Sequence, residues 1–205
     1  MARRLERLLA TAGHSAVGIA RNPDHVGDVQ AAGAQAVVCD LEATDLDAVA
    51  AHLQGADAVV FAAGAGPGSG IPRKQAVDRD ASVLMADAAE RAGVRRFVQI
   101  SSMGAGAPPR PGTDETFAAY LGAKAEAEED LRRRDLDWTV LRPGGLTNAP
   151  GTGRVRLASS VPRGQISRDD VAAVIVGLLR DARGLGQTLE LVAGDTPIDQ
   201  ALEQL

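Results

Sequence analysis

Short apolar runs alternate along the chain with longer segments that place apolar residues at helical spacing. The helical patterns occupy 3–12, 22–32, 45–54, 72–92, 115–134 and 167–179, and a short one ends the chain. The apolar runs occupy 14–20, 34–39, 57–62, 96–100 and 138–141, with further extended segments at 153–157 and 188–192. Strands without polar alternation, separated by helices, predict a parallel sheet covered on both faces. The predicted fold class is therefore α/β, a doubly wound parallel sheet in a single domain over residues 1–205.

The composition narrows the possible partners. A formal net charge of −5 gives no electrostatic reason to expect nucleic-acid binding. Cys39 is the only cysteine, which excludes an internal disulfide and favours a reducing compartment. No apolar run approaches the roughly 20 residues of a membrane span, and the three histidines show no metal-ligand spacing. We therefore expect a cytoplasmic protein that acts on a small molecule, without a metal or a membrane partner, while the oligomeric state stays open.

Lysine and tyrosine are so rare in this chain that their positions carry information. There is one tyrosine, Tyr120, and Lys124 lies four residues after it on the same face of a predicted helix. A nearby ammonium favours the phenolate and so lowers the pKa of a tyrosine towards the range useful for general acid or base chemistry. Ser101 and Ser102 follow an apolar strand at the carboxyl edge of the predicted sheet, where ligands meet such sheets. Each feature also has a purely structural explanation. Tyr120 and Lys124 could be an exposed pair on a helix, and Ser101 and Ser102 could be turn residues.

Together with several shorter stretches, these residues give the chain a family resemblance. The stretches, in chain order, are 18–23, 38–41, 61–64, 97–102, 120–124 and 141–144. The chain resembles the short-chain dehydrogenase/reductase superfamily, in the atypical NAD(P)H-binding branch that includes sugar-epimerase-like, NmrA-like and flavin-reductase-like proteins. The fold that this resemblance implies is Rossmann-like.

The resemblance also implies roles for particular residues. Tyr120 would be the acid/base, Lys124 would hold the nicotinamide ribose and tune Tyr120, and Ser102 would orient a substrate carbonyl or hydroxyl. The implied cofactor-binding residues are Arg21, Asn22, Asp40, Leu41, Ala62, Ala63, Gly64, Ser101, Lys124, Pro143 and Gly144.

The first part of a dinucleotide-binding fold is not recognisable in the sequence. That fold opens with a strand and a glycine-rich loop that binds pyrophosphate, whereas this chain opens with a helical pattern. We expect the missing strand and loop, about ten residues, to be encoded upstream of Met1. The glycine-rich stretch 64–70 is not a substitute, because its spacing differs and Pro67 lacks an amide hydrogen.

The predicted strand 14–20 corresponds to the second strand of the dinucleotide-binding fold, and the residues at its end indicate which cofactor is used. An acid there would accept the ribose 2′-hydroxyl of NAD, but the strand runs into Arg21, whose guanidinium suits the 2′-phosphate of NADP. The prediction is NADP, with NAD as the alternative if Arg21 is merely solvated.

Two functions fit these observations. The first is an NAD(P)H-dependent oxidoreductase or epimerase-like enzyme that acts on a small carbonyl or hydroxyl substrate through Tyr120. The second is a non-catalytic NAD(P)-binding redox sensor or regulatory protein of the NmrA-like kind, because a fold alone does not establish chemistry. The tyrosine, lysine and serine set favours the enzyme.

Overall fold

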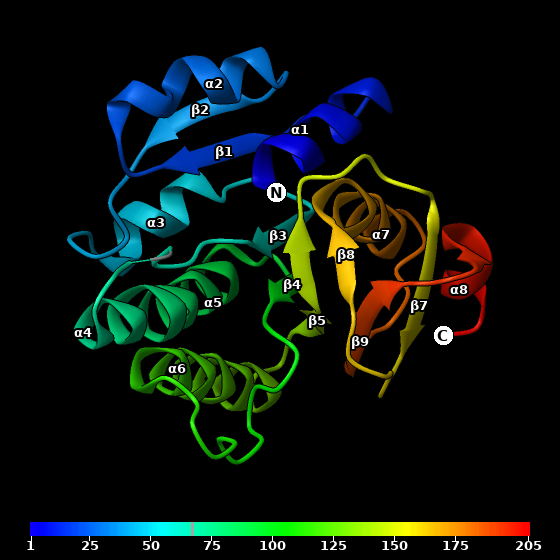
Figure 1. The fold of residues 1–205 in the computed structure, drawn as a ribbon. Coiled ribbons are helices and arrows are strands. Elements are labelled where there is room, and N and C mark those ends of the chain that lie inside the picture. The colour runs from blue at the N-terminus through cyan, green and yellow to red at the C-terminus, as the bar shows by residue number, and fades with distance from the viewer. Residues whose placement is uncertain (67) are drawn as a thin grey trace. The chain divides into compact units, whose positions relative to one another are not determined.

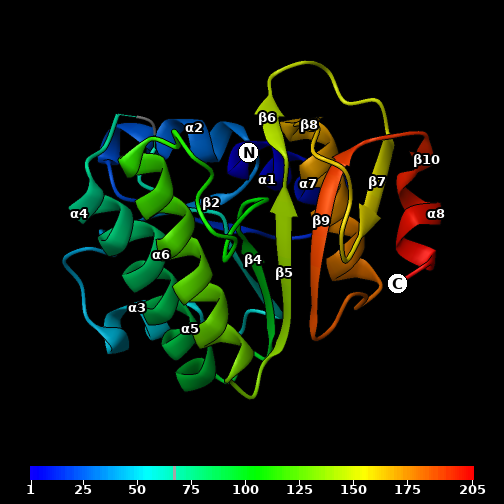
Figure 2. The same ribbon diagram turned by 60° about the horizontal axis from the view of Figure 1, so that its bottom comes forward.

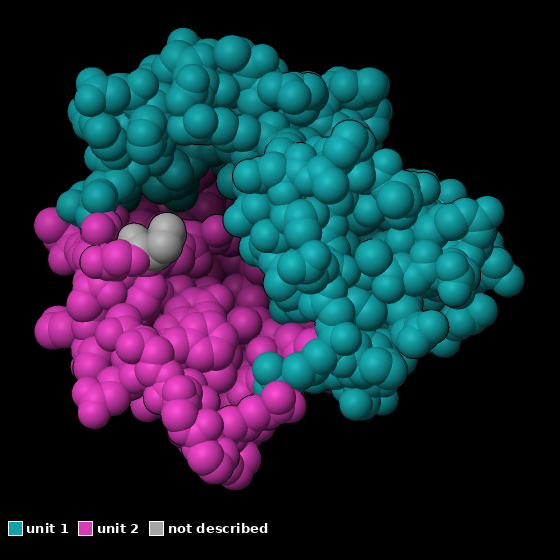
Figure 3. Space-filling view, in the orientation of Figure 1, with its two compact units in different colours: residues 1–40, 143–185, 189–205 teal, residues 41–142, 186–188 magenta. Residues whose placement is uncertain are grey.

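The computed structural model describes residues 1–66 and 68–205, so the prediction made for Pro67 falls on a residue that it does not describe. The chain divides into two compact units, coloured separately in Figure 3. Unit 1 comprises residues 1–40, 143–185 and 189–205, and unit 2 comprises residues 41–142 and 186–188. As predicted, the fold is α/β, with helices and mostly parallel strands alternating along the chain (Figure 1).

Unit 2 is built on the parallel strands β3, β4 and β5 (Figures 1 and 2). Val59 pairs with Phe97 and Phe97 with Trp138, which places the carboxyl ends of all three strands at one edge. Helices α3, α5 and α6 lie side by side on the same face of this sheet (Figures 1 and 2). The elements are α3 Leu46–His52, β3 Ala58–Phe61, α4 Ile71–Arg73, η2 Lys74–Asp80, α5 Ala81–Ala92, β4 Arg96–Ile100, α6 Glu115–Arg132 and β5 Asp137–Pro143.

Local sequence explains where the helices of unit 2 begin and end. Asp45 and Asp114 are N-caps whose carboxylates accept hydrogen bonds from the backbone N–H groups of Ala48 and Phe117, each at 2.9 Å. Helix α5 ends at Gly93, whose φ of 75° lies in the left-handed region that favours glycine. The predicted helix over 72–92 is confirmed but is not regular, because η2 is a π-helix, a rare form often found at functional sites.

Unit 1 contains three small groups of strands. Strands β1 and β2 are parallel to each other, and β6 and β8 are parallel to each other. The short strand β10 pairs with β7 and β7 with β9, both antiparallel. Helix α1 packs against α7, which also contacts α8. The elements are α1 Ala2–Thr11, β1 Val17–Ala20, η1 Pro23–His25, α2 Val26–Ala31, β2 Gln35–Val38, β6 Gly145–Thr147, β7 Arg154–Ala158, β8 Gln165–Ser167, α7 Arg168–Arg180, β9 Gln187–Ala193, β10 Thr196–Pro197 and α8 Ile198–Glu203.

The strand β2 differs from its prediction as a buried strand. Val38 is 49% exposed, and Cys39, which follows the strand, is half-buried. The predicted strand is present. Its side chains are incompletely buried because, among the described residues, β2 pairs only with β1. Within the described chain, no helix combines the length and apolar character that crossing a bilayer requires.

Candidate active site

The three residues predicted to be catalytic lie together in unit 2. Helix α6 is continuous from Glu115 to Arg132, so Tyr120 and Lys124 share one face, with the Lys124 ammonium 6.0 Å from the centre of the phenol ring. Ser102 follows the carboxyl end of β4, and its side chain is close enough to the phenol of Tyr120 to influence the pKa of that phenol. Phe117 stacks on the Tyr120 ring at 5.8 Å between ring centres. The structure therefore brings the residues of the predicted proton-transfer group together.

Lys124 is anchored at the carboxyl ends of β3 and β4. Its side chain is 4% exposed, and Nζ donates to the carbonyl oxygens of Ile100 at 3.1 Å and Ala63 at 3.5 Å. It also forms an ion pair with Asp78, whose Oδ1 lies 3.2 Å from Nζ. Burial lowers the pKa of Lys124, and the charge of Asp78 opposes that shift. The ammonium is thus fixed in place by a carboxylate and two strand ends.

Asp78 is a site residue that the sequence alone did not identify. It lies near the end of the π-helix η2 and is fully buried. Its Oδ2 accepts a hydrogen bond from the backbone N–H of Ala65 at 3.2 Å. A Cβ on Gly64 would come within 3.0 Å of its Oδ1, so glycine leaves room for this carboxylate. Asp78 therefore ties Lys124 to the loop after β3, which contains the predicted cofactor residues Ala62, Ala63 and Gly64.

The expected direction of the Tyr120 pKa shift is wrong. Burial raises the pKa of the phenol above its ordinary value, and the negative charge of Asp78 raises it further. The hydrogen bond from Ser102 acts in the opposite direction, because it stabilises the phenolate. Lys124 does not lower this pKa as expected because its charge is paired with Asp78. Tyr120 is therefore protonated at neutral pH and suited to donate a proton.

This shift can be measured directly, since Tyr120 is the only tyrosine. Ultraviolet difference titration should give a single phenol ionisation with a midpoint above the ordinary value of about 10. Ser102→Ala should move the midpoint higher, because the opposing hydrogen bond is lost. The fluorescence of the single tryptophan, Trp138, serves as the control that each titration is read on folded protein. A wild-type midpoint below 10, or a lower midpoint in the serine variant, would contradict the assignment.

Ser101, the neighbour of Ser102, belongs to a buried charge network. Its hydroxyl donates to Glu128, a fully buried residue of α6. Glu128 also accepts two hydrogen bonds from the guanidinium of Arg142, at 2.9 and 2.6 Å, and one from Arg132. The Ser101 hydroxyl is thus committed to α6, and its contact with a cofactor stays a prediction. Arg142, at the end of β5, is therefore held by an ion pair with Glu128.

The other predicted cofactor residues are divided between the units. Leu41 lies in unit 2, whereas Arg21, Asn22, Asp40, Pro143 and Gly144 lie in unit 1. Arg21 directly follows β1, as predicted, and Asn22 caps η1 through a 3.0 Å hydrogen bond from the N–H of Asp24. A Cβ on Gly144 would come 2.3 Å from the Gly164 carbonyl oxygen, so only glycine fits there. Their roles towards a cofactor stay predictions.

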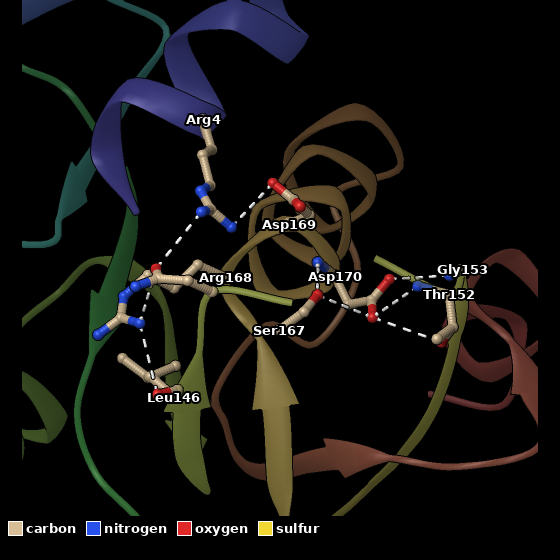
Figure 4. A network of polar contacts seen from close by, with 9 residues as sticks. Arg4, Leu146, Thr152, Gly153, Ser167, Arg168, Asp169 and Asp170 are labelled. Carbon is tan, nitrogen blue, oxygen red and sulfur yellow. Dashed lines mark hydrogen bonds and ion pairs between the residues drawn. The ribbon is translucent and has the colours of Figure 1, made fainter. Parts of the chain in front are cut away.

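A second polar network, in unit 1, fixes residues 152–153, which directly precede β7. The backbone N–H groups of Thr152 and Gly153 donate to the buried carboxylate of Asp170, at 3.0 and 2.8 Å (Figure 4). Ser167, the predicted N-cap of α7, accepts from the Asp170 N–H and donates to its carboxylate, both at 2.9 Å. Because the backbone N–H groups of Thr152 and Gly153 already donate to Asp170, they are not available to bind an external anion.

The described residues include no group of three or more histidine, cysteine, aspartate or glutamate side chains placed to hold a metal ion. The polar groups that converge in unit 2 are instead a phenol, a hydroxyl and an ion-paired ammonium. Such groups bind hydroxyl and carbonyl oxygens and move protons.

Comparison with known proteins identifies the family to which the chain belongs. YhfK of Bacillus subtilis, named as an uncharacterized sugar epimerase, is 38% identical over 94% of this chain and 88% of its own length. The structure of the oxidoreductase ylbE from Lactococcus lactis has a TM-score of 0.85 and 28% identity, and covers 99% of this chain and 90% of that chain. ChuY of Escherichia coli O157:H7, an anaerobilin reductase, has a TM-score of 0.77 and 28% identity, and covers 95% and 91%. A family model described as NAD(P)H-binding matches residues 1–182, and the chain belongs to this NAD(P)H-binding family of Rossmann-like proteins.

Proposed function

We propose that this protein is an NAD(P)H-dependent oxidoreductase in which Tyr120 exchanges a proton with a small carbonyl or hydroxyl substrate. The observation that carries this proposal is the placement of the only tyrosine beside the buried ammonium of Lys124, which a buried carboxylate holds in place. A purely structural tyrosine would not need a buried cation held by a buried carboxylate next to it. The reductase and epimerase names of relatives point to the same class of chemistry.

In the reducing direction, each residue has a distinct task. The nicotinamide supplies the hydride when it is bound. When the substrate binds, the Ser102 hydroxyl turns its one hydrogen from the phenol to the substrate oxygen and orients that oxygen towards Tyr120. Tyr120 then gives up its phenolic proton as negative charge develops on the substrate oxygen. The carbonyl thus gains one hydride on carbon and one proton on oxygen, and the alcohol leaves. The phenolate that remains then accepts a hydrogen bond from Ser102 until a proton from solvent replaces the one transferred.

The residues present fit a nicotinamide cofactor. The Lys124 ammonium contacts three oxygen atoms, and its contact with the Ala63 carbonyl is the longest, at 3.5 Å. Because the longest hydrogen bond is the weakest, a ribose hydroxyl would replace that contact first. Arg21, at the end of β1, would bind the 2′-phosphate of NADP, and Asp40 and Leu41 would flank the adenine. We therefore propose NADP as the preferred cofactor.

Separate measurements of binding and turnover distinguish the two candidate functions. Calorimetric titration should show tighter binding of NADPH than of NADH, and a panel of small aldehydes, ketones and quinones should include compounds reduced at the expense of NADPH. Binding without turnover on any member of the panel would favour the non-catalytic sensor. Tighter binding of NADH would contradict the role proposed for Arg21.

A further inference from the structure

Lys74, the only lysine besides Lys124, also lies next to Tyr120. It is the first residue of the π-helix η2, and it is only 8% exposed. Its Nζ lies 5.4 Å from the centre of the Tyr120 ring and donates to the Gly66 carbonyl oxygen at 2.7 Å. Both lysines of the chain therefore place their ammonium groups within about 6 Å of its single tyrosine.

The two lysines differ in how their charge is balanced. Lys124 is paired with Asp78, the only carboxylate within ion-pairing distance of either lysine in the described part of the chain. Lys74 has a carbonyl oxygen and the face of an aromatic ring, which are partial negative charges and do not neutralise an ammonium. Removing a charge from water without an opposite charge is costly, so buried charges in proteins are normally paired. Unit 2 thus carries one buried cation in need of an anion, beside the proposed proton donor.

We propose that Lys74 binds the carboxylate of an acidic substrate. This inference rests on the proposed function, because it is the role of Tyr120 that places the reacting carbon near Lys74. A carboxylate on Lys74 with a carbonyl oxygen at the phenol corresponds to a 2-oxo or 3-oxo acid, in which one or two bonds separate the two groups. The phosphates of the cofactor offer the same kind of charge, but Lys74 lies beside the Tyr120 ring, where the proposed reaction places the substrate, so the anion assigned to it is the substrate carboxylate.

The test compares oxo acids with their methyl esters, which differ in charge and little in shape. For wild-type protein with NADPH, kcat/KM should be higher for the acid. Lys74→Gln should lower kcat/KM for the acid by about 10–100-fold and leave the ester almost unchanged, since a charge-assisted hydrogen bond is lost only with the acid. Lys74→Arg should keep the preference for the acid. Arg73→Gln is the matched control, because Arg73 is the preceding residue and pairs on the surface with Glu42.

A binding measurement separates failure of this inference from failure of the proposed function. Oxamate carries a carboxylate beside an unreactive amide carbonyl, and calorimetry should show that wild-type protein binds it and that the Lys74→Gln variant does not. If oxamate binds in this way but no oxo acid is reduced, the anion site stands and the oxidoreductase proposal fails. Equal losses for acid and ester, oxamate binding that does not depend on Lys74, or weakened NADPH binding with an unchanged acid preference would each overturn the assignment.

Discussion

Glu128→Ala should lower the free energy of unfolding by about 3–5 kcal/mol, the cost of removing one partner from a buried ion pair. Glu128 is fully buried and accepts hydrogen bonds from Ser101, Arg132 and Arg142. The side chain of Arg142 is only 19% exposed, so it would lose its carboxylate where water can compensate only in part. Urea unfolding followed by circular dichroism measures the change.

The matched control is Glu129→Ala, which removes the same side chain from an exposed position one residue further along α6. Its effect should stay within about 0.5 kcal/mol, as is usual for surface substitutions. Glu128→Gln, which keeps acceptor atoms but loses the charge, should fall between the two alanine variants. Equal stability of the two alanine variants would show that the buried network contributes no net stability.

Regular elements could be predicted from the sequence because their signals are local. The alternation of apolar runs with helical patterns located β4 at its observed bounds and α6 and α7 to within a few residues. The strands β6, β8 and β10 were not predicted, since each has only two or three residues and is defined by its partner. In β7 and β9, Val155 pairs with Ala193, a separation that no local pattern reveals.

The candidate site was predicted in part for the same reason. Tyr120 and Lys124 are four residues apart, so a helical pattern was enough to place them on one face. Asp78, by contrast, reaches Lys124 only through the packing of η2 against α6, and the π-helical form of η2 has no signature in the residues 74–80.

The helical spacing of apolar residues does contain a signal that could have identified Lys74 and Asp78 as site residues. Lys74 and Asp78 occupy the same stripe as Val77, Ala81 and Met85, all of which are buried. Polar residues on such an apolar stripe must find partners inside the protein. Applied to α6, the same rule selects Lys124 and Glu128 between the buried residues Leu121 and Leu131. Charged residues on the apolar stripe of a helix are therefore candidates for a functional site or for a buried polar network.

Tyr120→Phe should lower turnover by about 10²–10⁴-fold, the usual contribution of a general acid, while NADPH affinity stays unchanged. Phenylalanine keeps the ring that packs against Phe117 and Lys74 and removes only the hydroxyl that carries the proton. Phe117→Leu is the matched control, because it alters the aromatic packing and keeps the phenol. That control should retain turnover close to the wild-type rate.

Single-turnover oxidation of bound NADPH by a carbonyl substrate, compared between wild-type protein and the Tyr120→Phe variant, tests the proposed role of Tyr120 most directly. We expect rapid loss of the reduced-nicotinamide absorbance with wild-type protein and a rate about 10²–10⁴-fold lower with the variant, at equal NADPH occupancy. Equal rates for the two proteins would contradict the assignment of Tyr120 as the proton donor.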